Sequence, residues 1–217
     1  PSPPKSRQPD IPWKQIAGMR DKVRVSPGME RIAMMWPLAV ELSAIGPPAG
    51  EDSPRSAWPV GAGPLAILRS LNEDFIDLLR SLLQEEALLL VVGAYAMAAH
   101  GVPRATGGID VWVEADDLNA ARVFRALARF GAPLDVKESD FAGPDRVVQT
   151  GFPPRRIDVL TGVSGLKCEA AWAGRTAAAF SALKVPVIGR DHLIANKRAA
   201  GRPKDLADLA VLDPQSK

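Results

Sequence analysis

The 217-residue sequence predicts a mixed α/β or α+β domain, a small mixed sheet flanked by helices, behind a poorly ordered proline-rich third. Most prolines lie in residues 1–64, and each one removes a backbone hydrogen-bond donor. From residue 65 onward, amphipathic helical patterns alternate with apolar runs of strand length. We therefore expect a largely irregular segment at residues 1–64 and one folded domain at residues 65–217.

Composition limits the classes of function. The formal net charge of +2 is too small to indicate a nucleic-acid-binding protein by itself. No apolar run approaches the roughly 18 residues that span a bilayer, so we expect no membrane partner. Cys168 is the only cysteine, which excludes an intrachain disulfide and suits a cytoplasmic protein. A lone thiol is more often a small buried group than a nucleophile.

Two pieces of the N-terminal third have helical patterns. They cover residues 13–23 and 28–43, and Pro37 interrupts the second. Because prolines and glycines surround both pieces and raise the entropy cost of folding, we expect little order there.

The domain begins with an amphipathic helix over residues 65–86. Its leucines recur at helical spacing on one face, and charged side chains occupy the other. Residues 88–92 form a continuous apolar run, which predicts a strand covered on both faces. Gly93 ends this strand, and the small residues at 94–100 predict a short helix.

A second strand is predicted over residues 109–114. Asp116 or Asp117 follows it as the N-cap of a helix over residues 118–130. The outer face of that helix carries three arginines, which fit either a solvated surface or a phosphate site: Arg122, Arg125 and Arg129. The remaining predicted elements are strands at 147–149 and 156–160 joined by a turn at 151–154, a helix at 167–175, a strand at 185–188, and helices at 192–200 and 203–212.

Two aspartates lie inside predicted strands. Asp110 and Asp158 are each flanked by apolar neighbours. A buried carboxylate costs free energy unless it is hydrogen-bonded or binds a metal, so both are candidate functional residues. Nucleotidyl transfer needs carboxylates to hold Mg²⁺, and a glycine turn such as Gly93 lets backbone N–H groups approach phosphate oxygens.

Residues 68–212 resemble the nucleotidyltransferase superfamily, of the AbiEii-toxin-like or minimal-nucleotidyltransferase type. The resemblance lies in the order of five segments: 90–96 (LVVGAYA), 104–106 (RAT), 108–113 (GIDVWV), 156–160 (RIDVL) and 193–208 (LIANKRAAGRPKDLAD). It implies a nucleotidyltransferase-like core that binds an NTP with Mg²⁺. An active member would transfer NMP to a hydroxyl group of RNA, protein or a small molecule.

The resemblance also implies roles for individual residues. Asp110 and Asp158 would be catalytic and would ligate the metal, and Gly93 and Ala94 would cradle the phosphates. Lys197 would contact the triphosphate.

The remaining residues implied at the nucleotide lie after Lys197. Asp205 and Asp208 would shape the same cleft. On charge alone, Lys197 and the basic residues that follow it fit a solvated helix end instead. Both interpretations stay open.

One departure from the family pattern is serious. Gly108 stands where the family carries the first carboxylate of a D-x-D pair. Glu114 lies on the same strand face as Asp110 but about 13 Å away, too far to replace it. Whether the protein is an enzyme therefore depends on this gap. Restoring the acid by Gly108→Asp and assaying NTP consumption with Mg²⁺ would discriminate an enzyme from a binding protein. The alternative is a catalytically degenerate domain that acts as an antitoxin-like binding protein.

A shorter resemblance lies in residues 10–21 (DIPWKQIAGMRD), which are similar to part of the HepT or HEPN ribonuclease toxins. Val25 stands where that family carries a catalytic histidine, five residues after Arg20, so no ribonuclease activity is implied. Members of that family are often encoded beside minimal nucleotidyltransferases. We interpret the segment as a relic or a reading-frame fusion in which Arg20 has no catalytic role. The usual gene neighbourhood of the family implies a toxin–antitoxin or defence-like setting and a HepT/HEPN-type partner.

Overall fold

The computed structural model describes residues 24–27, 71–132 and 136–213. The helices expected at 13–23 and 28–43 lie outside these residues, and the domain boundary near residue 65 stays a prediction. Within the described residues the elements are, in order, β1 (Arg24–Pro27), α4 (Glu73–Gln84), β2 (Leu89–Val92), α5 (Gly93–Ala99), β3 (Gly108–Val113), α6 (Asp117–Phe130), α7 (Ser139–Ala142), β4 (Arg146–Thr150), β5 (Arg156–Leu160), α8 (Cys168–Ala173), β6 (Thr176–Phe180), β7 (Leu183–Val187), α9 (Arg190–Ala200) and α10 (Pro203–Leu212).

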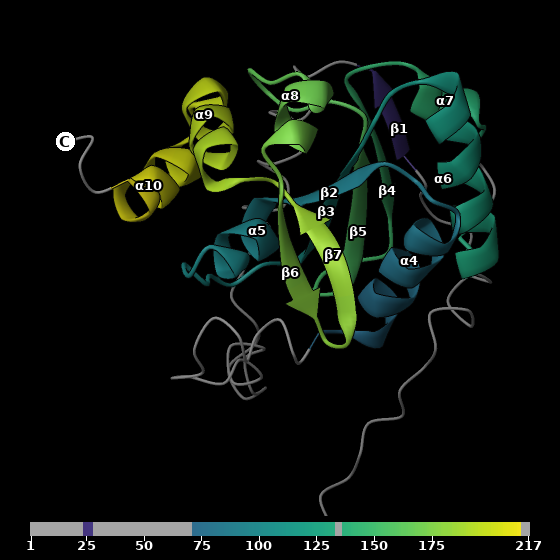
Figure 1. The fold of residues 1–217 in the computed structure, drawn as a ribbon, viewed down its shortest axis with the longest axis horizontal. Coiled ribbons are helices and arrows are strands. Elements are labelled where there is room, and N and C mark those ends of the chain that lie inside the picture. Colours follow the sequence, from purple (N-terminus) through teal and green to yellow (C-terminus); the bar gives the residue numbers. More distant parts are fainter. Residues whose placement is uncertain (1–23, 28–70, 133–135, 214–217) are drawn as a thin grey trace, which may run out of the picture.

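The strands form one mixed sheet with the order β1-β4-β5-β3-β2-β7-β6. Parallel pairs join β3 to β5 and β2 to β7, and the other neighbours are antiparallel. Helices α4, α6 and α7 lie on one side of this sheet, and α5, α9 and α10 lie on the other (Figure 1). The mixed α/β fold predicted from the sequence is confirmed.

Side-chain alternation along β3 decides which residues face the core. Ile109, Val111 and Val113 are fully buried on one face. Asp110 and Trp112 therefore point to the opposite face, because successive strand residues alternate. Strand β2 is buried along its whole length, as its continuous apolar run predicts.

Capping residues set the helix boundaries. Helix α4 begins at Glu73, because the side chain of Asn72 accepts a hydrogen bond from the backbone N–H of Asp74 at 2.8 Å. It therefore starts later than predicted. Asp116 caps α6 in the predicted way by accepting from the backbone N–H of Asn119 at 2.7 Å.

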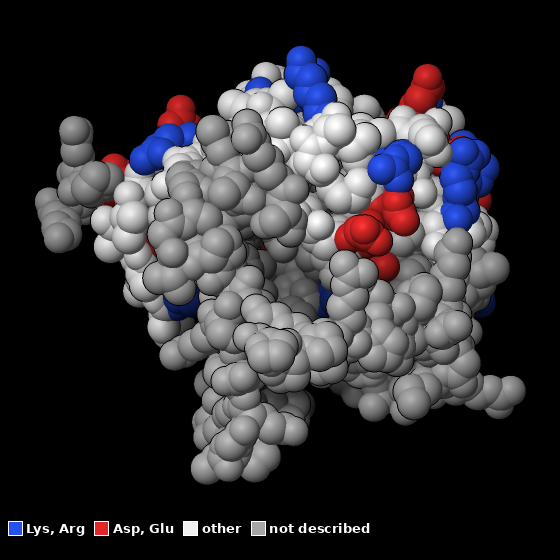
Figure 2. All heavy atoms as spheres, turned by 90° about the horizontal axis from the view of Figure 1, so that it is seen from below, with Lys and Arg blue, Asp and Glu red and all other residues white. Residues whose placement is uncertain are grey.

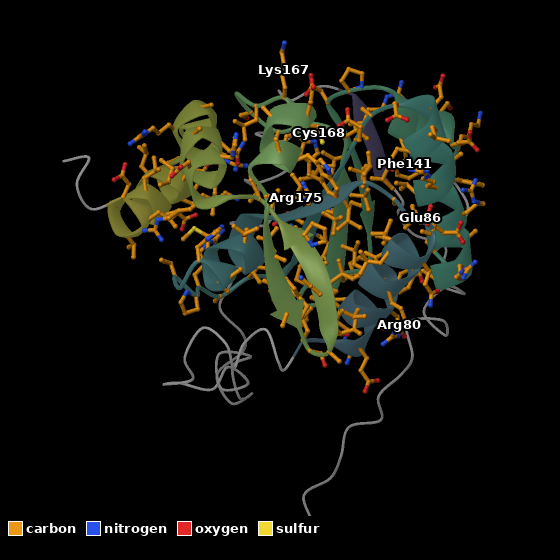
Figure 3. The ribbon with its side chains drawn as sticks, in the orientation of Figure 1. Arg80, Glu86, Phe141, Lys167, Cys168 and Arg175 are labelled. Carbon is orange, nitrogen blue, oxygen red and sulfur yellow. The ribbon has the colours of Figure 1, made fainter. Side chains whose placement is uncertain are left out.

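Three elements were not predicted from the sequence: β1, the short helix α7 and β6. Helix α7 is anchored by Phe141, which is fully buried and points from α7 into the molecule (Figure 3). Strand β6 has the sequence TAAAF, and its three central alanines have little strand preference. It forms because it pairs with β7 in a hairpin and buries Phe180. The helix predicted at 167–175 is correspondingly shorter, since Thr176 already belongs to β6.

Among the described residues, no helix is both long and apolar enough to cross a membrane. Charged side chains of both signs are scattered over the face shown in Figure 2, and its visible described part has no continuous basic surface. This agrees with the small net charge of the sequence.

Candidate functional site

The two aspartates singled out from the sequence are direct neighbours in the sheet. Asp110 on β3 pairs in register with Asp158 on the parallel strand β5. In-register residues of adjacent strands point to the same face, and such strands lie about 4.8 Å apart. The structure therefore brings both carboxylates together on the face that carries Trp112.

Asp158 is buried and already has hydrogen-bond partners. Arg156, two residues earlier on the same strand face, donates from Nε to both carboxylate oxygens at 3.1 and 3.0 Å, and its Nη2 lies 2.8 Å from Oδ2. Gln149 on β4 donates from Nε2 to Oδ1 at 2.8 Å. Both oxygens of Asp158 are thus occupied by donors, and its charge is neutralised by a bidentate guanidinium.

Asp110 differs from Asp158 in having no hydrogen-bond partner among the described residues. Burial and, less strongly, the negative charge of Asp158 raise the pKa of Asp110 to about 6. Three cations oppose this shift: Lys204 most strongly, then Arg156 and Arg104. The site therefore combines a half-buried carboxylate, without a hydrogen-bond partner in the described part of the chain, with a cluster of positive charge.

Gly93 contacts this carboxylate directly. The backbone there has φ +63°, and a Cβ built at this position would lie 2.0 Å from Oδ2 of Asp110. Glycine is thus needed both for the left-handed backbone and for the close approach of the side chain. Ala94, the next residue, is buried. That Gly93 and Ala94 cradle a phosphate stays a prediction.

Backbone atoms of β5 occupy the space that a side chain at position 108 would need. A Cβ at Gly108 would lie 2.2 Å from the carbonyl oxygen of Arg156, its register partner on β5. A side chain at this position requires the two strands to move apart. Gly108→Asp would therefore strain this strand pairing and would not simply restore the acid.

The residues present do not fit a divalent cation. Mg²⁺ sites of transferases use several carboxylates with free oxygens. Here the described residues contain no group of three or more His, Cys, Asp or Glu that could hold a metal. Of the two carboxylates, Asp158 has both oxygens engaged by Arg156 and Gln149. Glu114 is remote from the pair and interacts with Cys168, which begins α8 (Figure 3).

Lys197 lies in a buried ion cluster between α9 and α10. Its Nζ lies 3.0 Å from Oδ1 of Asp205 and 2.6 Å from Oδ2 of Asp208, and all three side chains are buried. Burial raises the pKa of Asp205, but hydrogen bonds from Arg202 and Lys197 outweigh it and lower the pKa overall. Lys197 is therefore not part of a solvated helix end. Its contact with a triphosphate, and that of Asp205, stay predictions.

Arg104 joins this ion cluster to the aspartate pair. Its Nε lies 3.3 Å from Oδ1 of Asp208, while its charge also acts on Asp110. Lys204, at the start of α10, acts on both Asp110 and Asp205. Helix α10 and the segment before β3 thus meet over the aspartate pair.

Sequence reasoning assigned no role to Arg156, Gln149 or Arg104. Arg156 was detectable, because a residue two positions before Asp158 shares its strand face. Arg104 begins the segment 104–106 that carries part of the family resemblance, but its contact with Asp208 depends on the packing of α10. For Gln149 no sequence signal was available, since it reaches the site only through strand pairing.

No protein-family model matches the chain, and no curated protein sequence matches it either. Among solved structures, the chain is similar to a protein from Thermotoga maritima described as a "putative nucleotidyltransferase". The identity is 14%, the match covers 66% of this chain and 94% of that chain, and the TM-score is 0.42.

Proposed function

We propose that this chain is a nucleotide-binding domain of the nucleotidyltransferase type in which the transfer reaction is lost. The observation that carries the proposal is the bidentate contact of Arg156 with Asp158, together with the backbone of Arg156 that blocks a side chain at its register partner Gly108. Nucleotidyl transfer depends on metal ions that neutralise the charge developing on the phosphates. A metal at Asp158 would have to displace a partly buried guanidinium, and a second metal carboxylate has no room.

Nucleotide binding is supported by the charge around Asp110. Arg104, Arg156 and Lys204 all act on this carboxylate, from three different segments of the chain. Arginine and lysine are the side chains that bind phosphate groups most often, arginine through paired N–H donors. The resemblance of residues 90–113 and 156–160 to nucleotidyltransferases points to a nucleotide as the phosphate-bearing ligand.

The test measures binding and turnover separately. Calorimetry with ATP, GTP, CTP and UTP is expected to give heat for at least one of them, and pyrophosphate release with Mg²⁺ or Mn²⁺ is expected to stay at background. Mg²⁺-dependent release that Asp158→Asn abolishes would show an active transferase. Absence of heat for all four nucleotides would overturn nucleotide binding.

The biological role of a domain that binds a nucleotide but does not transfer NMP would depend on another protein. We propose an antitoxin-like role in a toxin–antitoxin or defence-like setting, with a HepT/HEPN-type ribonuclease as the partner. The support is the resemblance in residues 10–21, which lie outside the described residues. Co-expression with a HEPN-type ribonuclease is expected to yield a complex in size-exclusion chromatography, and separate elution would contradict this role.

A further inference from the structure

We propose that the site binds the phosphates of its ligand without a divalent cation, and that Arg156 supplies the positive charge that a metal supplies in active transferases. This inference deepens the proposed function and rests on it for the identity of the ligand as a nucleotide. It begins from the disagreement between the metal expected at Asp158 and the guanidinium found there.

Arg156 holds Asp158 with only part of its guanidinium. Nε and Nη2 face the carboxylate at 2.8 to 3.1 Å, and Nη1 makes no hydrogen bond within the described part of the chain. A guanidinium has five N–H donors in a planar fork. The Nη1 edge is therefore available to a phosphate while the other edge stays fixed. The whole side chain is 19% exposed, so the guanidinium is not sealed inside the protein.

The charge of the whole cluster favours an anion. In the described residues, five cationic side chains and four carboxylates interact through ion pairs or electrostatics: Arg104, Arg156, Lys197, Arg202 and Lys204 with Asp110, Asp158, Asp205 and Asp208. A divalent cation would add charge to a cluster that is already positive by one, whereas a phosphate group would bring it toward neutrality.

Gly108 belongs to the same arrangement. Because the carbonyl oxygen of Arg156 fills the place of a Cβ at position 108, this strand pairing excludes the first metal carboxylate. The residue two positions before each aspartate thus opposes metal binding. On β3 this residue is Gly108, where a carboxylate side chain has no room, and on β5 it is Arg156, whose guanidinium is positively charged.

The experiment compares ligands with and without metal. Calorimetry is carried out on the full chain with tripolyphosphate and with ATP, GTP, CTP and UTP, in EDTA and then in excess Mg²⁺. Tripolyphosphate and at least one nucleotide are expected to bind in EDTA, with no gain in affinity when Mg²⁺ is added. Binding that appears only with Mg²⁺ would overturn the inference.

Variants assign the binding to Arg156. Arg156→Gln is expected to weaken binding in EDTA roughly 10-fold or more, since it removes a charged donor. The matched control is Arg129→Gln, which removes an arginine of α6 paired with Glu85 at 2.6 Å and is expected to leave binding unchanged. Equal affinity of Arg156→Gln and the native protein would overturn the role of Arg156.

A double variant keeps the inference testable if Arg156→Gln alone fails to fold. Arg156→Gln leaves Asp158 with Gln149 as its remaining partner, so the double variant Arg156→Gln/Asp158→Asn removes both charges of the pair together. It is expected to fold and to show the same loss of binding. Full binding by the double variant would overturn the inference.

The two proposals fail in different ways. If tripolyphosphate binds in EDTA through Arg156 and no nucleotide does, the metal-free phosphate site stands and the proposed nucleotide function fails. If a nucleotide binds only with Mg²⁺, the nucleotide function stands and the metal-free site is wrong. If neither ligand binds, both are wrong.

Discussion

The carboxylate of Asp110 lies against the α-carbon of Gly93, so that a Cβ at position 93 would be 2.0 Å from its Oδ2. The turn between β2 and α5 and the aspartate on β3 are therefore one unit. Neither residue can change without affecting the other, and this coupling can be measured.

Gly93→Ala is expected to destabilise the protein by about 2–4 kcal/mol, because it combines a left-handed backbone with a clash against Asp110. Gly101→Ala is the matched control, since Gly101 has φ +88° and a Cβ there would meet nothing within 4 Å. It should cost only about 1–2 kcal/mol. Urea unfolding measures both values.

A double-mutant cycle separates the clash from the backbone strain. In an Asp110→Ala background the carboxylate is absent, so the cost of Gly93→Ala should fall to that of Gly101→Ala. An undiminished cost in that background would show that the contact with Asp110 does not limit this position.

Gly108→Asp should destabilise the protein by about 2–4 kcal/mol and should not create transferase activity, because its Cβ would meet backbone of β5. Gly108→Ala is expected to cost a similar amount, since the steric conflict arises at the Cβ itself. Gly107→Ala is the control, because its Cβ would contact only the side chain of Pro153, at 3.2 Å. Native-like stability of Gly108→Asp, measured by thermal and urea unfolding, would show that the strands accommodate the acid.

The raised pKa of Asp110, about 6, makes stability depend on pH. The folded state holds this proton more tightly than the unfolded chain, whose aspartate titrates near 3.9. Between roughly pH 4 and pH 6 the folded state binds more protons, so this group's stabilising contribution falls as the pH rises. Lys204, Arg156 and Arg104 reduce the shift but do not abolish it.

Asp110→Asn removes this dependence. At pH 7 the variant should be more stable than the native protein by up to about 3 kcal/mol, and the difference should vanish near pH 4. Urea unfolding at pH 4, 5.5 and 7 provides the comparison. A difference that stays constant over this range would contradict the raised pKa.

The sequence was sufficient for the strands that build the site and for the meeting of its two acids. Apolar sequence predicted β2, β3 and β5 to within about one residue. Strand β2 is a continuous apolar run, and in β3 and β5 apolar residues flank a single aspartate. Strand β6 was missed, because its alanines have no strand preference and its pairing with β7 determines its conformation.

The sequence did not reveal that Arg156 both blocks a side chain at Gly108 and pairs with Asp158. The block depends on the carbonyl oxygen of Arg156 on the neighbouring strand, and the ion pair depends on the direction of the Arg156 side chain. Arg104 and Lys204 act on Asp110 from positions one hundred residues apart in the sequence. Only the packing of α10 brings them together.

Lys197→Met tests whether the buried ion cluster is structural. The substitution leaves the buried carboxylates of Asp205 and Asp208 without their shared ammonium, so it should cost about 3–5 kcal/mol at pH 7. The cost should shrink as the pH falls and Asp205 becomes protonated, because hydrogen bonds from Arg202 and Lys197 lower the pKa of Asp205. Lys167→Met is the control, since Lys167 is exposed and points away from the molecule (Figure 3).

The same variant distinguishes the two roles considered for Lys197. If its ammonium serves only the two carboxylates, the fraction of Lys197→Met that stays folded should bind ATP with native affinity in calorimetry. A variant that keeps native stability but loses ATP binding would instead place Lys197 at the triphosphate. In the folded structure its ammonium lies within 3.0 Å of a carboxylate oxygen from each of two aspartates, which favours the first outcome.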